Sequence, residues 1–285
     1  MPRTYSDIYI DVRKKLRGKG IEAYQLEARL LVAHAAGKSV EELLRELPLY
    51  ASDRVEEKVS ELTERRMRDE PLAYLLGEWE FYGLPFIVTR DVLIPRPDSE
   101  VLVETAVKAL RGRKMDARVL DLCAGSGCLG CAIASELPAA HVVLADNSAK
   151  ALEVAKRNIL KNRLNPRVTC VETDALLSPP PVLGSFELLI CNPPYIPSGE
   201  IDGLDASVRD FEPAAALDGG VDGLDFYRAV VPKWKNVVRK GGLMIFEVGE
   251  GQSESVMELM KKNGLTNVGS ARDNNGIERA VCGNV

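Results

Sequence analysis

From Arg118 onward, short apolar runs alternate with segments of helical periodicity, and this alternation leaves few folds open to the chain. It predicts strands at 118–121, 141–146, 167–171, 186–191 and 242–248, and helices near 127–136, 148–162, 223–239 and 253–263. Strands and helices in alternation build a parallel sheet covered on both faces. The end of the chain, 266–271 and 278–282, predicts a closing hairpin. We therefore expect an α/β domain whose mostly parallel sheet ends in a C-terminal antiparallel hairpin.

The residues up to about 70 have a helical pattern instead. Ser39-Val40-Glu41-Glu42 has the sequence of a capping box and precedes a run of leucines. A strongly charged helix is predicted from Ser52 to about Asp69, ending before Pro71. Positive and negative charges are nearly balanced across this region. Two interpretations stay open, a solvated helical bundle and a recognition module.

Two further segments separate these regions. Residues 77–88 are rich in aromatic residues and broken by Gly83 and Pro85, a pattern typical of a β-hairpin connector. The run Leu93-Ile94-Pro95-Arg96-Pro97-Asp98-Ser99-Glu100 predicts a rigid loop that opens a helix, with Asp98 or Ser99 as its N-cap. The predicted organisation is a helical domain at 1–70, a connector at 71–90 and the α/β domain at 91–285.

The composition is that of an ordinary globular protein, with 46% hydrophobic and 28% charged residues among 285. The net charge of −5 argues against a nonspecific nucleic-acid binder, because phosphate contacts need clustered Lys and Arg. No apolar run approaches membrane-spanning length, and the first residues lack the apolar core of a signal peptide. We expect a cytoplasmic protein with no membrane partner.

Six cysteines raise the question of metal. Cys123, Cys128 and Cys131 have the spacing C-x4-C-x2-C, which superficially resembles an iron–sulfur motif. They fall in a glycine turn and the helix after it, among apolar residues. Buried reduced thiols are the expectation for such positions, and no metal is expected.

A glycine turn and two acidic residues follow three successive strands. A glycine turn, Gly125-Ser126-Gly127, follows the first strand and allows a ligand to approach the backbone. Asp146 ends the next strand, where an acidic side chain accepts from ribose hydroxyls; a helix N-cap is the alternative. Asp174 follows the third strand, within reach of an adenine amino group, or else is a solvated loop residue. Together these positions predict an adenosyl ligand in an α/β crevice.

The turn also leaves dinucleotide binding open. Read literally, Gly125-Ser126-Gly127-Cys128-Leu129-Gly130 matches the dinucleotide fingerprint G-x-G-x-x-G. The glycine pattern alone therefore does not separate the two kinds of ligand.

The tetrapeptide Asn192-Pro193-Pro194-Tyr195 distinguishes an adenosyl ligand from a dinucleotide. It follows the apolar run 186–191, and proline forces the chain into a stiff extended path past the strand end. The Asn192 side-chain oxygen and the Pro193 carbonyl then form two neighbouring acceptors, with an aromatic ring two residues on. A dehydrogenase does not need such a pair of acceptors, whereas a methyltransferase that acts on an NH2 group needs them to bind that group. The unpatterned stretch 192–222 after the strand is long enough to be a functional loop.

These motifs together resemble the HemK/PrmC family, the protein-(glutamine-N5) methyltransferases of peptide chain release factors. The tetrapeptide is shared with nucleic-acid amino-methyltransferases, whereas the Ile-Pro-Arg-Pro and Phe-Glu-Pro segments are more specific. Cys123 and Ala124 depart from the family's usual turn, but both ligand-facing glycines remain. The resemblance spans nearly the whole chain and is carried by Pro71-Leu72-Ala73-Tyr74-Leu75-Leu76-Gly77, Glu80-Phe81-Tyr82-Gly83, the run 93–100, Asn192-Pro193-Pro194-Tyr195-Ile196, Phe211-Glu212-Pro213, Gly241-Gly242-Leu243 and Glu247.

The resemblance implies a Rossmann-like methyltransferase domain that uses S-adenosylmethionine to methylate the glutamine of the release factors' Gly-Gly-Gln motif. It implies release factors as protein partners, no direct nucleic-acid substrate, and a monomer. The catalytic residues implied are Asn192, Pro193 and Tyr195, and Pro194 joins them in holding the substrate. The cofactor-binding residues implied are Arg96, Cys123, Ala124, Gly125, Ser126, Gly127, Asp146, Asp174, Ala175 and Asn192.

Two other functions stay open. A nucleic-acid amino-methyltransferase would use the same tetrapeptide on a flipped base and would need a basic face, which the net negative charge does not favour. A noncatalytic binding module would carry a vestigial α/β domain, yet Gly125, Gly127, Asp146 and Asn192 are all intact.

Overall fold

The computed structural model describes residues 2–111 and 116–285, so Met1, with which the predicted helical domain begins, lies outside the described residues. The chain divides into two compact units. One comprises Met1–Gly77 together with Asp205–Phe211, and the other comprises Glu78–Leu204 together with Glu212–Val285.

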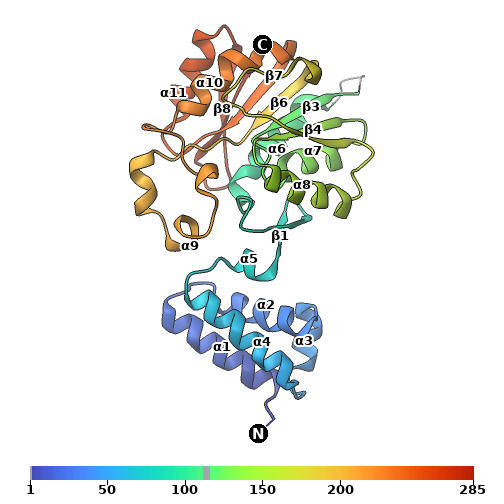
Figure 1. The fold of residues 1–285 in the computed structure, drawn as a ribbon, viewed down its shortest axis with the longest axis vertical. Coiled ribbons are helices and arrows are strands. Elements are labelled where there is room, and N and C mark those ends of the chain that lie inside the picture. The colour runs from blue at the N-terminus through green and yellow to red at the C-terminus, as the bar shows by residue number, and fades with distance from the viewer. Residues whose placement is uncertain (1, 112–115) are drawn as a thin grey trace. The chain divides into compact units, whose positions relative to one another are not determined.

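The first unit is helical (Figure 1). Capping boxes begin two of its helices. Thr4 exchanges hydrogen bonds with Asp7, and the predicted box of Ser39 and Glu42 is confirmed. Its core is mainly aliphatic, and its buried Glu27 accepts two hydrogen bonds from Arg66. The helices are α1 (Tyr5–Lys19), α2 (Tyr24–Ala36), α3 (Val40–Glu46), α4 (Asp53–Met67), α5 (Leu72–Leu76) and α9 (Ala206–Arg209).

The second unit begins with the predicted hairpin, in which β1 (Glu78–Phe81) pairs antiparallel with β2 (Leu84–Ile87). Tyr82 and Gly83 join the strands with φ of 52° and 72°, and both angles are positive as a two-residue hairpin turn requires. The hairpin occupies only the second half of the segment predicted as a connector, since Leu72–Leu76 is the helix α5.

The sheet that follows has seven strands in the order β5-β4-β3-β6-β7-β9-β8. Its first five strands are parallel, and β9 runs antiparallel to both β7 and β8, which confirms the predicted C-terminal hairpin. The first strand in sequence, β3, lies inside the sheet between β4 and β6. The strands are β3 (Arg118–Leu122), β4 (His141–Asp146), β5 (Val168–Glu172), β6 (Phe186–Cys191), β7 (Val238–Glu247), β8 (Thr266–Arg272) and β9 (Glu278–Asn284).

Helices cover both faces of this sheet (Figure 1). Side chains alternate along each strand, so that Leu188 and Ile190 of β6 join one apolar core while Leu189 and Cys191 join the other. One face carries α6 (Glu100–Leu110), α7 (Cys128–Glu136) and α8 (Ala149–Lys161), and the other carries α10 (Asp225–Trp234) and α11 (Ser253–Lys262).

Short 3-10 turns complete the described part of the chain. The predicted functional loop after β6 contains two of them and one isolated bridge, Ile196 with Asp218. Within the described residues, no helix is long and apolar enough to cross a membrane. The turns are η1 (Pro97–Ser99), η2 (Pro181–Leu183), η3 (Ser198–Gly203), η4 (Ala214–Ala216) and η5 (Lys235–Val237).

Candidate active site

A cleft opens in the second unit beyond the carboxyl ends of the parallel strands. The strand order changes direction at β3, whose neighbours are β4 on one side and β6 on the other, and open α/β sheets bind ligands at such a point. Most of the residues predicted from the sequence line this cleft, namely Arg96, Cys123, Ala124, Gly125, Ser126, Asp146, Ala175, Asn192 and Pro194.

Four predicted residues are not part of the lining: Gly127, Asp174, Pro193 and Tyr195. A Cβ on Gly127 would lie 2.6 Å from Leu144 Cδ1, so this glycine is needed for packing of the turn on β4. Asp174 comes after the end of β5 and accepts a hydrogen bond from the Leu176 N–H at 2.8 Å. Its neighbours Thr173 and Ala175 line the cleft instead.

The glycine turn is held open by left-handed backbone conformations. Cys123, Gly125 and Gly127 have φ of 61°, 53° and 78°. The Gly125 N–H donates to Asp146 Oδ2 at 2.8 Å, and the Ser148 N–H donates to Asp146 Oδ1 at 2.9 Å. Asp146 therefore joins the turn to the start of α8, while Ser148 is the N-cap of that helix.

The Asp146 carboxylate keeps free acceptor positions at the cleft, since each of its oxygens receives one N–H and can accept another. Burial raises the pKa of Asp146, and the hydrogen bonds from Gly125 and Ser148 act in the opposite direction. A carboxylate fixed in this way is a ready acceptor for a pair of hydroxyl groups.

Asn158 of α8 is a second support of the turn, which sequence reasoning missed. Its fully buried amide donates to the carbonyls of Ser126 at 2.9 Å and Ile87 at 3.0 Å, and accepts from the Ile87 N–H. One side chain thus joins the glycine turn to the hairpin. An Asn within a helix carries no sequence signal for this role, because both partners lie far away along the chain.

Asp121 of β3 lies beneath the turn, with none of its surface exposed. Its Oδ2 accepts from the Gly130 N–H at 2.8 Å, and its Oδ1 has no hydrogen-bond partner in the described part of the chain. Burial raises the pKa of Asp121 to about 7. A Cβ on Gly130 would lie 2.4 Å from Leu144 Cδ2, so the third glycine of the fingerprint serves helix–strand packing.

The most informative contact missed from the sequence joins two loops at the cleft's edge. Glu212, with 5% of its surface exposed, accepts from the Ile94 N–H at 3.1 Å and forms an ion pair with Arg96. The residues beside these partners, including Pro95 and Pro213, line the cleft. The Ile-Pro-Arg-Pro and Phe-Glu-Pro motifs, more than a hundred residues apart, therefore form one wall.

The tetrapeptide follows β6, and only some of its side chains line the cleft. Asn192 lines the cleft, and its amide makes no hydrogen bond to any other residue that the structure describes. The Tyr195 hydroxyl donates to Glu247 Oε1 at 3.3 Å, and Glu247 itself is only 2% exposed. Burial raises the pKa of the Tyr195 hydroxyl, which therefore stays protonated as a donor. The sequence did not indicate this inward direction of the tyrosine.

The cleft fits an adenosyl ligand. The Gly125 position leaves open space where a Cβ would stand, so a ligand can reach the backbone of the turn. Asp146 supplies acceptors, and apolar side chains such as Leu93, Ala175 and Phe226 supply walls for a flat ring.

A parallel sheet with an antiparallel end, and a cleft at its glycine turn, fit an S-adenosylmethionine-dependent methyltransferase, and comparisons with known proteins identify the chain as one. Residues 97–209 match the family described as Methyltransferase small domain. Among solved structures, the hMettl16 catalytic domain superposes with a TM-score of 0.56 at 15% identity, covering 78% of this chain and 81% of that one, a likeness of fold alone.

Other comparisons identify the family. Residues 7–77 match the PrmC N-terminal domain. The release factor glutamine methyltransferase of Geobacter sulfurreducens is 42% identical over 281 residues, covering 96% of this chain and 94% of the relative. That of Bradyrhizobium diazoefficiens is 36% identical, covering 94% and 90%. The chain belongs to the release factor glutamine methyltransferase family.

Proposed function

We propose that this protein transfers a methyl group from S-adenosylmethionine to N5 of the glutamine in the Gly-Gly-Gln motif of peptide chain release factors, and so supports translation termination. Family membership over nearly the whole chain carries this proposal. The cleft adds independent support, because its glycine turn, carboxylate and free asparagine amide stand at the edge where α/β sheets bind ligands.

The cofactor is assigned to the cleft between the glycine turn and the Glu212 wall. The turn, Cys123 through Gly127, holds the methionine part, and Asp146 accepts from the ribose hydroxyls. Asp174 and Ala175 border the adenine. Of these two residues only Ala175 lines the cleft, together with Thr173, so Ala175 is the better candidate for direct contact. Arg96 closes the cleft from the wall. When bound, S-adenosylmethionine supplies a methyl group on a positively charged sulfur.

The substrate amide is assigned to the tetrapeptide. An amide nitrogen is a poor nucleophile because its lone pair is delocalised into the carbonyl. Asn192 Oδ1 and the Pro193 carbonyl accept the two N–H bonds of the glutamine, and this orients the nitrogen. The same acceptors stabilise the positive charge that grows on the nitrogen during transfer, and the alkylated nitrogen, now acidic, releases one proton to water. Pro194 restricts the space around the amide, and Tyr195, which does not line the cleft, supports the tetrapeptide from behind through its hydroxyl bond to Glu247.

We assign recognition of the release factor's body to the helical domain, predicted at 1–70. A short loop that presents one glutamine offers little binding surface, and contacts remote from the reacting group can supply orientation. The further proposals are a monomeric enzyme that works in the cytoplasm, where release factors act.

The Asn192→Ala variant tests the proposal. Removal of one preorganised polar group costs about a hundred- to thousandfold in turnover, so the variant should lose most transfer, and its cofactor affinity should fall less than its turnover does. Mass spectrometry of a release factor after incubation with enzyme and S-adenosylmethionine measures the product. Methylation of nucleic acid in place of the factor, or near-normal turnover of the variant at saturating substrate, would contradict the proposal.

A further inference from the structure

Tyr195, the last residue of the tetrapeptide, is held at its main chain by a group to which the proposed mechanism gives no role. Gln252, which precedes α11, donates from Nε2 to the Tyr195 carbonyl at 2.9 Å, and its Nε2 lies 3.5 Å from the Gly223 carbonyl. Its Oε1 accepts from the Gly249 N–H at 3.0 Å. One side-chain amide therefore joins the tetrapeptide, the loop that follows it and the turn after β7.

Glycines bring the main chain directly against Tyr195. A Cβ on Gly219 would lie 2.7 Å from Tyr195 Cα, and one on Gly223 would lie 2.2 Å from the Tyr195 carbonyl oxygen. Gly223 has a left-handed φ of 75°, but Gly219 does not have a left-handed φ. At Gly219 the requirement for glycine therefore comes from the space that Tyr195 occupies.

These glycines belong to residues 217–225, which we call the clamp segment. The clamp segment pairs with the chain after the tetrapeptide: the Ile196 N–H donates to the Leu217 carbonyl at 3.0 Å, and the Gly219 N–H donates to the Ile196 carbonyl at 2.8 Å. The residue after Pro197 continues this pairing, since the Ser198 N–H donates to the Gly220 carbonyl.

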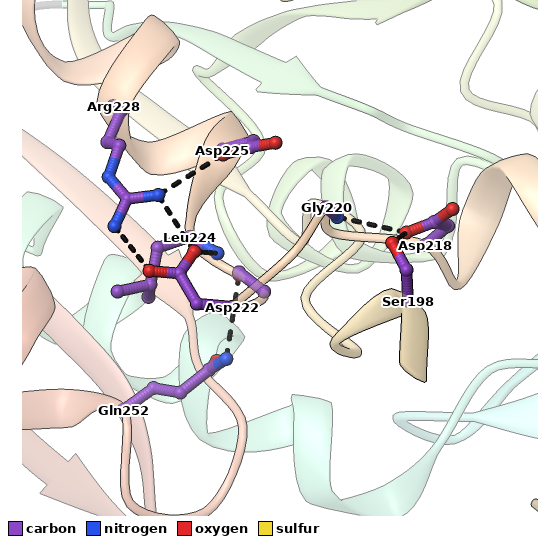
Figure 2. Close-up of polar contacts among 9 residues, drawn as sticks. Ser198, Asp218, Gly220, Asp222, Leu224, Asp225, Arg228 and Gln252 are labelled. Carbon is purple, nitrogen blue, oxygen red and sulfur yellow. Dashed lines mark hydrogen bonds and ion pairs between the residues drawn. The ribbon is translucent and has the colours of Figure 1, made fainter. Parts of the chain in front are cut away.

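The clamp segment is also braced by its own carboxylates. Figure 2 shows Asp218 accepting from both the Ser198 hydroxyl, at 2.7 Å, and the Gly220 N–H, at 2.9 Å. Further along the segment, Asp222 accepts from the Leu224 N–H and forms an ion pair with Arg228. The segment thus forms a fixed support for the backbone of Tyr195.

We propose that Gln252 and the clamp segment position the tetrapeptide for methyl transfer by fixing the main chain of Tyr195. This inference rests on the proposed function of the tetrapeptide. At one end, β6 fixes Cys191, which pairs with Phe246 of β7. At the other end, Gln252 fixes Tyr195. Between them two prolines have locked φ angles, so a shift at Tyr195 is carried to the acceptors of Asn192 and Pro193.

Two replacements of Gln252 test the hydrogen bond. Gln252→Glu keeps the acceptor for Gly249 and loses the donor to Tyr195, while Gln252→Met keeps the side-chain length and loses both. Misplacement of a reacting group by about 1 Å can cost about a hundredfold, so we expect kcat to fall by about ten- to a hundredfold in both variants. Cofactor affinity and KM for the release factor should change little, since these residues lie outside the cleft lining.

A role limited to stability predicts a different result. It would lower the melting temperature and would affect cofactor binding and kcat in parallel. Either that parallel loss or a wild-type kcat in Gln252→Met would overturn the inference. The control is Glu254→Gln, an exposed position on the first turn of α11.

A steric pair of variants tests the same point without removing a hydrogen bond. Gly219→Ala places a methyl group against Tyr195 Cα and should lower kcat. Gly199→Ala, on the same loop, meets no atom within 4 Å and needs no left-handed φ, so it should behave as wild type. Equal kcat in the two alanine variants would contradict the inference.

Hydrogen exchange separates this inference from the proposed function. In Gln252→Met the amides of Ile196 and Gly219 should exchange faster than in the wild type, whatever the enzyme methylates. Unchanged exchange there overturns the positioning role. A wild-type enzyme that leaves release factors unmethylated while these amides respond as expected would overturn the proposed function alone.

Discussion

At the scale of single residues, Glu247 is a buried acid at the carboxyl end of β7, beside Tyr195. Burial raises its pKa from 4.5 to about 7, since the charged form loses its water. The folded chain therefore binds this proton more tightly than the unfolded chain does. The contribution of Glu247 to stability is fully present below pH 4.5 and is lost as the pH rises through about 7.

A Glu247→Gln variant should remove this dependence. Its amide oxygen can still accept from the Tyr195 hydroxyl, but the side chain stays neutral at every pH. The free energy of unfolding of the wild type should therefore fall relative to that of the variant between pH 5 and pH 8. This window spans the raised pKa of about 7. Urea unfolding at a series of pH values measures the difference. A difference that stays constant across the series would contradict the raised pKa.

Asp146 yields a second prediction. Hydrogen bonds to a charged group contribute about 1.5–3 kcal/mol, so Asp146→Ala should weaken cofactor binding by about one to two decades. Asp146→Asn should lose less, because its amide oxygen can still accept from the Gly125 N–H. Calorimetry with S-adenosylmethionine measures both. Glu172→Gln is the control, since Glu172 is exposed and pairs with Asp146 across β4 and β5. Equal affinity in Asp146→Ala and the control would refute the ribose assignment.

The role of a residue could be predicted where a local sequence pattern indicates it. Asp146 could be assigned to the cleft because it ends an apolar run, and Asn192 because two prolines follow it. Glu247 and Gln252 could not be assigned, since their partner Tyr195 lies more than fifty residues away. The inward direction of Tyr195 depends on that buried carboxyl, which no local pattern reveals.

At the scale of elements, Glu212 joins two loops that together form one wall of the cleft. Its ion pair with Arg96 is partly exposed at the arginine, 36%, so the charge attraction there is weakened by water. The larger part of its contribution comes from the Ile94 N–H, which is buried and would lose its acceptor without Glu212.

Glu212→Ala should therefore destabilise the protein by about 1–3 kcal/mol, the cost of leaving a buried donor unpaired. It should also weaken cofactor binding, because Pro95 and Pro213 line the cleft. The matched control is Glu136→Ala, which removes an exposed ion pair with Arg111 and should change stability by no more than about 0.5 kcal/mol. Urea unfolding of the two variants checks the prediction, and equal losses would contradict it.

Most of the elements were predicted, but the helix expected near 223–239 ends at Trp234 and β7 already begins at Val238. The order of the strands in the sheet was not predicted. The runs at 118–121 and 186–191 are strands because both faces of the sheet are covered, which requires apolar residues at successive positions. The placement of β3 between β4 and β6 depends on pairing between segments far apart in the chain. The short helix α5 was missed because a five-residue apolar run fits a strand equally well.

At the scale of the whole molecule, the helical unit exposes apolar side chains that its own fold does not use. Leu49 is 55% exposed and Tyr50 is 69% exposed. Under the proposed recognition role, a Leu49→Ser, Tyr50→Ser variant should lose about thirtyfold or more in kcat/KM on an intact release factor, since interface side chains that matter cost more than about 1 kcal/mol each. Methylation of an isolated loop peptide should be unaffected.

The control for this variant is Leu160→Ser, an equally exposed leucine, 64%, on α8 of the other unit. Steady-state kinetics on the factor and on the peptide separate recognition from chemistry. If the double variant methylates the intact factor as well as the control does, these side chains take no part in recognition.

The wall joined by Glu212 also has a consequence for the time at which the enzyme becomes active during its own synthesis. During synthesis, Arg96 joins the chain before its ion-pair partner Glu212 does, and 116 residues separate the two. Until Glu212 emerges, Ile94 and Arg96 lack this shared acceptor, and one side of the cleft is incomplete. A ligand stabilises a chain only to the extent that the chain binds it, so the cofactor should assist folding little until about three-quarters of the chain has been made.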